Sequence, residues 1–126
     1  MGRKIIIEAG KITSEAVLAE TEAASAIWDA LPIESTSNTW GEEVYFSTPV
    51  TLSLDETAKE VVDMGDLGYW PTGRALCIFF GLTPMSRGDE IRPASAVNIV
   101  GKIIGDPKLF NEVRSGEKVR VRKAVS

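Results

Sequence analysis

The chain has 126 residues and a mass of 13.6 kDa, the size of one compact domain, and we expect a single domain over 1–126. Hydrophobic residues make up 44% and charged residues 25%, which is typical of a globular protein with its own core. There is no histidine and a single cysteine, Cys77. This composition excludes Ser-His-Asp and Cys-His catalysis, histidine-ligated metals, iron–sulfur clusters and an internal disulfide, so we expect no metal and no cofactor.

Charge is unevenly distributed along the chain. Residues 1–66 carry four Lys or Arg against thirteen Asp or Glu, whereas residues 102–126 carry seven against three. The net charge of −4 argues against nucleic-acid binding, which needs a basic face that displaces counterions. At the basic end, Lys118, Arg120 and Arg122 alternate with two valines, a pattern that predicts a strand with one solvated face.

No segment has the pattern of a targeting signal or a membrane span. The three isoleucines after Lys4 are too few for the apolar core of a signal peptide. The longest apolar run, 75–82, is far shorter than the ~20 residues that a membrane-spanning helix needs. The sequence therefore predicts a cytoplasmic protein with no membrane partner, and it leaves open whether the chain is a monomer or a homodimer.

The apolar pattern predicts strands along most of the chain. β-branched runs and apolar–polar alternation, separated by glycine, proline and other turn residues, indicate eight of them. The predicted strands are 3–8, 12–18, 33–40, 42–46, 59–63, 75–80, 97–104 and 117–123.

Two short helices have recognisable ends. Thr21 is a candidate N-cap for the first, which Pro32 ends. The second has Asp106 at its N-cap, Pro107 at its first position and Gly116 just past its end. The fold class is therefore mainly β, a closed eight-stranded antiparallel barrel with two short capping helices, although a sandwich fits the periodicity nearly as well.

Two long segments, 64–74 and 82–96, lack strand or helix periodicity. Long loops in a small domain are usually functional or mobile. Glycines and a proline restrict the path of the first segment and leave Tyr69 and Trp70 with limited room to be buried. We therefore expect any ligand to bind between these two segments.

A pair of adjacent carboxylates, Glu42 and Glu43, falls on a predicted strand. Neighbouring strand residues point to opposite faces, so the two cannot act together on one sugar as glycosidase carboxylates do. Glu43 shares its face with Tyr45. We expect one carboxylate to be structural and the other to accept a hydrogen bond in a pocket. Cys77 lies in an apolar strand without a basic neighbour, which predicts a buried, unreactive thiol.

Aromatic residues and arginines supply the remaining candidate site. Together they could form a pocket with flat apolar walls and a few donors, suited to a proline-containing peptide or a small planar group. Equally, the tryptophans could fill the ends of a barrel. The residues concerned are Trp40, Tyr45, Tyr69, Trp70, Arg74 and Arg92.

Three segments resemble the small prokaryotic cyclophilin-like proteins, also called atypical cyclophilins. They are 38–49 (NTWGEEVYFSTP), 65–81 (GDLGYWPTGRALCIFFG) and 92–103 (RPASAVNIVGKI). With the strands between them, the resemblance extends over nearly the whole chain. It implies a closed eight-stranded barrel with two helices.

The resemblance implies less about activity. In cyclophilins a strand arginine donates to the amide of the substrate proline and eases its rotation, next to a pocket histidine. The corresponding segment here, 40–46, has no arginine, and the chain has no histidine. The double phenylalanine of cyclophilins is matched by Phe79 and Phe80.

Three hypotheses follow. One is a module that binds a peptide or small ligand between 64–74 and 82–96. The second is a peptidyl-prolyl isomerase with Arg74 or Arg92 as the catalytic donor, and the third, a subunit of an amide-processing assembly, rests on fold analogy. The predicted ligand-binding residues are Trp40, Glu43, Tyr45, Tyr69, Trp70 and Phe80.

Overall fold

A computed structural model describes residues 3–124, which form ten strands, one α-helix and two 3-10 helices. The strands are β1 (Arg3–Ala9), β2 (Ile12–Leu18), β3 (Ile33–Thr36), β4 (Asn38–Thr39), β5 (Glu43–Ser47), β6 (Ala58–Lys59), β7 (Asp66–Trp70), β8 (Ala75–Phe79), β9 (Val97–Ile104) and β10 (Lys118–Lys123). The helices are α1 (Glu22–Ala30), η1 (Pro71–Gly73) and η2 (Pro107–Glu112).

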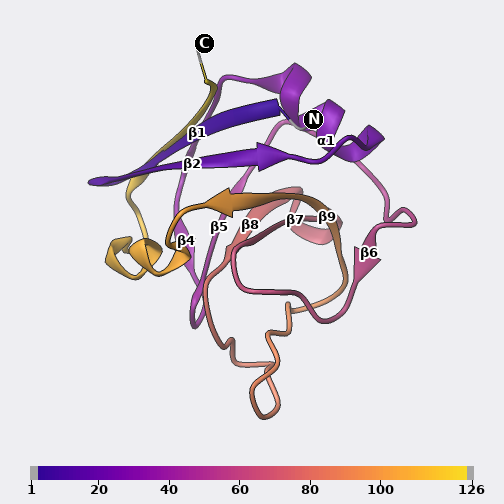
Figure 1. The fold of residues 1–126 in the computed structure, drawn as a ribbon, viewed down its shortest axis with the longest axis vertical. Coiled ribbons are helices and arrows are strands. Elements are labelled where there is room, and N and C mark those ends of the chain that lie inside the picture. The colour runs from indigo at the N-terminus through magenta and orange to yellow at the C-terminus, as the bar shows by residue number, and fades with distance from the viewer. Residues whose placement is uncertain (1–2, 125–126) are drawn as a thin grey trace.

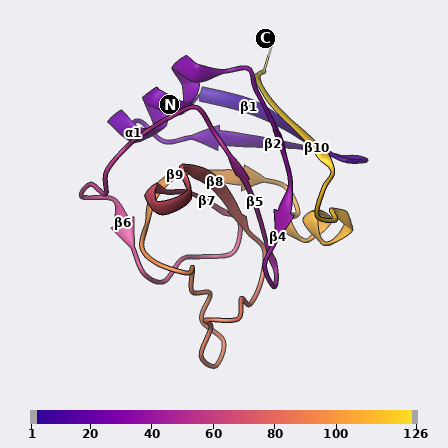
Figure 2. The same ribbon diagram turned by 180° about the vertical axis from the view of Figure 1, so that it is seen from behind.

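All ten strands belong to one antiparallel sheet. Its order is β3-β10-β1-β2-β9-β7-β8-β5-β4, with β6 paired to β9. The sheet curves strongly, so that β1 and β2 lie across the core from β5 and β8 (Figures 1 and 2). The mainly β, antiparallel class predicted from the sequence is therefore confirmed.

The closed eight-stranded barrel is not confirmed, because the hydrogen-bonded order of the described strands is open, with β3 and β4 at its edges. The two edge strands are consecutive and are separated by Ser37 alone. Ser37 donates its N–H to the Glu117 carbonyl at 2.8 Å and its hydroxyl to the Arg114 carbonyl at 2.6 Å. These bonds to the turn before β10 divide the single strand predicted over 33–40 into two.

The segment 64–74, predicted as a loop, contains β7 and η1. Strand β7 pairs with β8 on one side and β9 on the other. Its first four residues are buried, so its side chains do not alternate between a buried and a solvated face. The register also shifts between Leu67 and Gly68. A strand covered on both faces and interrupted by a glycine has no period-two pattern to detect.

The segment 82–96 is the long connection between β8 and β9, as predicted. It contains no helix or strand and extends away from the sheet (Figure 1). An isolated bridge joins Ile91 to Val62. The strand predicted over 59–63 is therefore reduced to this bridge and the two residues of β6.

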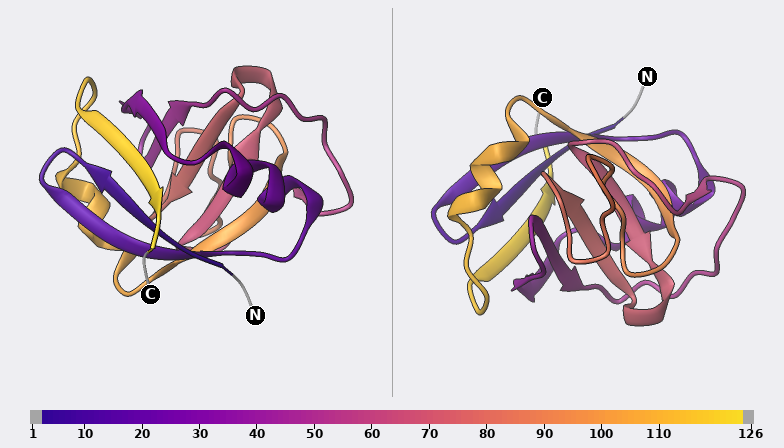
Figure 3. Two further views of the ribbon diagram at one scale, coloured as in Figure 1. Left: turned by 90° about the horizontal axis from the view of Figure 1, so that it is seen from above. Right: turned by 90° about the horizontal axis from the view of Figure 1, so that it is seen from below.

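The first helix begins as the sequence predicts. Thr21 Oγ1 accepts a hydrogen bond from the Ala24 N–H at 3.2 Å. Helix α1 lies across one end of the curved sheet and buries Ala23, Ala24 and Ile27 in the core (Figure 3). Within residues 3–124, no helix is long and apolar enough to cross a membrane.

The second helix is a 3-10 helix. Asp106 Oδ1 accepts from the Lys108 N–H at 2.9 Å, so the predicted N-cap is confirmed. The helix ends at Glu112, and Gly116 lies in the turn before β10, not at the helix end. Strand β10 has the predicted solvated face, with Arg120 exposed and Val119 buried.

Strands β5, β7 and β8 have an apolar cluster on each face. The main core includes Val44, Phe46, Leu67, Tyr69, Leu76 and Ile78. A smaller cluster on the other face consists of Val62, Cys77, Phe79, Ile91 and Val97, with Tyr45, Trp70 and Ile99 packed against it. Strict alternation along β5 and β8 divides their side chains between the two clusters.

Candidate functional site

A small cavity lies at the smaller cluster, beside the 82–96 segment. Its volume is about 160 Å³. An apolar cavity of about 150 Å³ holds a molecule of the size of benzene, so this one has room for a single ring-sized group. It is lined by Trp40, Glu43, Tyr45, Trp70, Cys77, Pro93, Ala94 and Val97, and we call it the aromatic cavity.

Tyr45 and Trp70 form two walls of the aromatic cavity that meet nearly at a right angle. Their ring centroids are 6.2 Å apart and their planes make an angle of 79°. Trp70 donates its Nε1 hydrogen to Ser95 Oγ at 2.7 Å, which ties the indole to the 82–96 segment. Both rings are half-buried, so each is fixed by packing on one side and lines the cavity on another.

The turn between β4 and β5 brings Trp40 and Glu43 to the same cavity. The Trp40 N–H donates to the Glu43 carbonyl at 3.0 Å across this turn. Gly41 has a φ of +60°, and a Cβ there would lie 2.9 Å from the Leu82 carbonyl oxygen. A glycine is needed because both the backbone angle and the close approach exclude a side chain.

Glu43 is the polar group of the aromatic cavity. Glu43 is 5% exposed, and its Oε1 has no hydrogen-bond partner in the described structure. Burial raises the pKa of Glu43 to about 7, and a hydrogen bond from Cys77 lowers it in part. At neutral pH the carboxyl is therefore present in both protonation states, with one oxygen unpaired.

Cys77 lies opposite Tyr45 in the β5–β8 ladder. Burial, and then the neighbouring Glu43, raises the pKa of its thiol well above the ordinary range. The thiol is therefore protonated at neutral pH, which makes it a poor nucleophile. The burial of Cys77 that the sequence predicts is confirmed.

Four of the six predicted ligand-binding residues meet in the aromatic cavity: Trp40, Glu43, Tyr45 and Trp70. The site is not simply a cleft between the 64–74 and 82–96 segments, since the first contributes only Trp70. The 82–96 segment contributes Pro93 and Ala94, and the other walls come from the β4–β5 turn, β5, β8 and β9. Sequence reasoning missed Cys77, Pro93, Ala94 and Val97 as lining residues.

Tyr69 and Phe80 do not line the aromatic cavity. Tyr69 is fully buried in the main core, where its hydroxyl donates to the Val50 carbonyl at 2.5 Å and accepts from the Leu52 N–H at 3.2 Å. Phe80 packs against Phe110, with 6.4 Å between ring centroids. The physical reason is that successive side chains of a strand point to opposite faces. Tyr69 therefore faces away from its neighbour Trp70, and Phe80 faces away from its neighbour Phe79.

Neither candidate arginine lines the aromatic cavity. Arg74 is exposed at the end of η1, in a left-handed conformation with φ of +47°. Arg92 donates from two guanidinium nitrogens to Glu90 Oε1, at 3.0 and 3.2 Å. It borders a neighbouring hollow of about 220 Å³ that shares Pro93 and Ala94 with the aromatic cavity.

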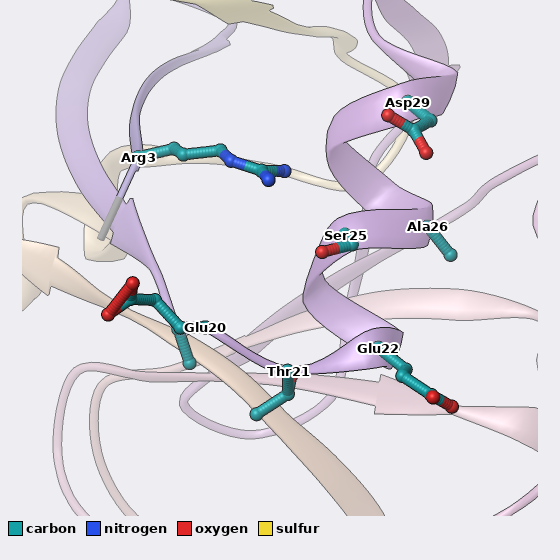
Figure 4. Close-up of a pocket in the computed structure, with 8 residues that line it drawn as sticks. Arg3, Glu20, Thr21, Glu22, Ser25, Ala26 and Asp29 are labelled. Carbon is teal, nitrogen blue, oxygen red and sulfur yellow. The ribbon is translucent and has the colours of Figure 1, made fainter. Parts of the chain in front are cut away.

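A larger groove of about 540 Å³ lies between β1 and α1 (Figure 4). It is lined by Arg3, Ala19, Glu20, Thr21, Glu22, Ser25, Ala26 and Asp29. None of these residues is buried, and the Thr21 hydroxyl caps the helix. The groove therefore lacks the fixed, desolvated groups that make the aromatic cavity the better candidate. No group of three or more potential metal ligands comes together within residues 3–124.

Ten antiparallel strands in one curved sheet, with an α-helix across one end, place the chain among the small, mainly β proteins. The Cyclophilin-like family model matches residues 3–122, so the protein belongs to the cyclophilin-like family, as the three quoted segments predict. The fold is similar to the solution structure of the hypothetical protein AF2241 from Archaeoglobus fulgidus, with a TM-score of 0.83 and 43% identity over 98% of this chain and 95% of that one. The comparison with curated proteins finds no match.

Proposed function

We propose that this protein is a binding module that holds one ring-sized group of a peptide or small molecule in the aromatic cavity, without chemical turnover. The observation that carries the proposal is the buried Glu43 carboxyl, whose Oε1 has no partner and which lies among three aromatic side chains. Buried polar groups in proteins are nearly always hydrogen-bonded, so an unpaired one at a cavity is a place for a ligand atom.

The other lining residues support binding more than catalysis. An apolar pocket with one or two fixed polar groups is the usual form of a small-molecule site. The Cys77 thiol is protonated and fully buried, so the cavity has no activated nucleophile. The one carboxyl of the described lining belongs to Glu43, and burial raises its pKa to about 7.

A prolyl isomerase is the second candidate, and the position of Arg92 at the adjoining hollow is the observation in its favour. Isomerisation needs a donor aimed at the amide of the proline, since the uncatalysed barrier is about 18–20 kcal/mol. The Arg92 guanidinium is instead engaged by Glu90 at 3.0 Å. Binding without turnover therefore has the stronger support.

The indole N–H signals in an NMR spectrum test the binding module, because the chain has three tryptophans and two of them line the aromatic cavity. The third, Trp28, lies on α1 beneath Arg3 and Lys123 and is an internal control. Titration with proline tetrapeptides and single-ring compounds should shift the Trp40 and Trp70 signals saturably and leave Trp28 unchanged. No shift with any compound, or equal shifts of all three signals, would contradict the proposal.

A protease-coupled assay on proline tetrapeptides separates the two candidates. We expect rates equal to the uncatalysed reaction. Turnover that is lost in Arg92→Ala or Arg74→Ala, but kept in the exposed control Arg87→Ala, would favour the isomerase and overturn the binding module.

A further inference from the structure

The aromatic cavity combines three features: aromatic walls, a buried acid and no basic residue. Trp40, Tyr45 and Trp70 surround it together with Glu43. The other lining residues, Cys77, Pro93, Ala94 and Val97, carry no positive charge. An occupant that matches all three features is apolar on its surface and positively charged.

We propose that the aromatic cavity is a cage for a compact organic cation, a methylated or quaternary ammonium group, whose methyl groups contact the aromatic rings and whose charge faces the Glu43 carboxylate. This inference rests on the proposed function and specifies its ligand class. The group could belong to a free small molecule such as choline or to a methylated lysine side chain, and the experiment below distinguishes these sources.

The aromatic walls favour a cation over a neutral group of the same shape. The faces of tryptophan and tyrosine rings carry negative electrostatic potential and attract organic cations. The rings of Tyr45 and Trp70 meet at 79°, so a group in the corner between them is next to both. The bond from Trp70 to Ser95 holds one wall in place before a ligand arrives, which reduces the entropy lost on binding.

The charge of the Glu43 carboxylate also favours a cation over a neutral group of the same shape. A buried carboxylate is unfavourable unless a positive charge or hydrogen bonds compensate it. The titratable groups facing it are Cys77 on β8 and Tyr45 on its own strand, and neither supplies a positive charge. The 82–96 segment and β9 contribute only Pro93, Ala94 and Val97 to the described lining, so the protein places no cation beside the carboxylate and a ligand cation would supply the missing charge.

The size of the cavity limits the cation. With about 160 Å³ available, a trimethylammonium group fits, as does one small ring. A longer chain attached to the cation has to leave through the opening. This is the arrangement expected for choline or for trimethyllysine, in which a compact charged head ends a thinner chain.

The decisive experiment compares choline with 3,3-dimethyl-1-butanol, which has the same shape with carbon in place of the charged nitrogen. Binding is followed by the Trp40 and Trp70 indole signals, with Trp28 as the control. Choline should bind about tenfold more tightly than the alcohol or better. Equal binding of the two would overturn the cage and leave the binding module intact.

Peptides with trimethyllysine and with unmodified lysine form the second arm. Preference for the trimethyllysine peptide over choline supports a protein ligand, and the reverse supports a small molecule. If neither choline nor the methylated peptide shifts the indole signals, the cage is overturned. If, in addition, no ring compound or proline peptide shifts them, the proposed function fails with it.

Glu43→Gln tests the role of the charge and keeps the shape of the side chain. It should weaken choline binding about tenfold and leave binding of the neutral alcohol nearly unchanged. The matched control is Glu42→Gln, because the neighbouring Glu42 carboxylate pairs with Lys108 at 3.0 Å and does not line the aromatic cavity. Equal loss of choline binding in both variants would contradict the role of Glu43.

The pH dependence of choline binding needs no variant. Choline keeps its charge at every pH, whereas Glu43 has a pKa of about 7 in the empty protein. Affinity should therefore rise about fivefold from pH 6 to pH 8 as the carboxylate forms, and binding of the neutral alcohol should not rise. A flat choline profile would contradict the proposal.

Discussion

The two faces of strands β5, β7 and β8 differ in whether their buried polar atoms have hydrogen-bond partners. On the main-core face, Tyr69 is fully buried and its hydroxyl both donates and accepts, to Val50 and from Leu52. On the other face, Glu43 is 5% exposed and its Oε1 has no partner in the described structure. The Tyr69 hydroxyl therefore has both of its hydrogen bonds within the protein, whereas one oxygen of the Glu43 carboxyl has none.

This difference is the reason that we propose ligand binding on the second face and a purely structural role for the main-core face. A satisfied buried hydroxyl stabilises a unique packing, whereas an unsatisfied carboxyl costs stability. Buried groups that lower stability in this way are found mainly at functional sites. The contrast between Tyr69 and Glu43 is therefore the main support for the proposed binding site at the aromatic cavity.

The largest expected effect is on the main-core face. Phe46→Ala removes a fully buried ring and should lower the free energy of unfolding by about 3–5 kcal/mol. Tyr45→Ala, one residue away on the half-buried opposite face, should cost clearly less. Urea denaturation measures both. Equal losses would mean that the two faces are packed alike.

Glu43→Gln should stabilise the protein, and increasingly so as pH rises. The pKa of Glu43 is raised from 4.5 to about 7 in the folded state, so the folded protein binds the proton more tightly than the unfolded chain does. Stability is thus lost between about pH 4.5 and 7, by roughly 3 kcal/mol in all, and the loss is complete above pH 7.

Denaturation of both proteins at pH 4.5 and pH 8 checks this expectation. The difference between Glu43→Gln and the natural protein should grow across this interval, while Glu42→Gln should show no comparable trend. A constant difference would mean that the Glu43 carboxyl titrates normally.

Tyr69→Phe should lower the free energy of unfolding by about 1–2 kcal/mol, because the Val50 carbonyl and the Leu52 N–H lose their partner. Choline binding should be unchanged, since Tyr69 faces away from the aromatic cavity. Urea denaturation and the indole titration measure the two quantities. Loss of binding without loss of stability would reverse the assignment of the faces.

The smallest effect is expected from Ser95→Ala. The Ser95 hydroxyl accepts from Trp70 at 2.7 Å in an exposed setting, so its loss should change stability by about 1 kcal/mol or less. Choline should bind less tightly because the Trp70 wall is no longer fixed, but the loss should be smaller than in Glu43→Gln. A loss as large as in Glu43→Gln would mean that the Trp70 wall, and not the charge, dominates recognition.

Local patterns predict the regular parts of the fold. The β1, β2, β9 and β10 strands and the two N-caps, Thr21 and Asp106, are visible in the sequence because alternation and capping are local. Strand β7 is not visible, because both its faces are buried and Gly68 interrupts it. The division at Ser37 depends on hydrogen bonds to Arg114 and Glu117, which are distant in the chain.

The candidate site follows the same rule. Alternation on β5 places Glu43 with Tyr45, and both line the aromatic cavity. The same alternation, applied across Tyr69 and Trp70, would have assigned Tyr69 to the opposite face. The register between β5 and β8 places Cys77 at the cavity, and the path of the long 82–96 loop places Pro93 and Ala94 there. Neither the register nor the loop path is a local property of the sequence, so no local pattern could identify these three residues.

The most direct test of the central claim is the titration of the Glu43 carboxyl, followed by carbon-13 NMR with and without choline. In the free protein the pKa should be about 7, and saturating choline should lower it because the bound cation favours the carboxylate. A pKa near the ordinary 4.5 in the free protein would contradict the burial of the Glu43 carboxyl. A pKa that choline leaves unchanged would contradict the claim that this carboxyl pairs with the bound cation.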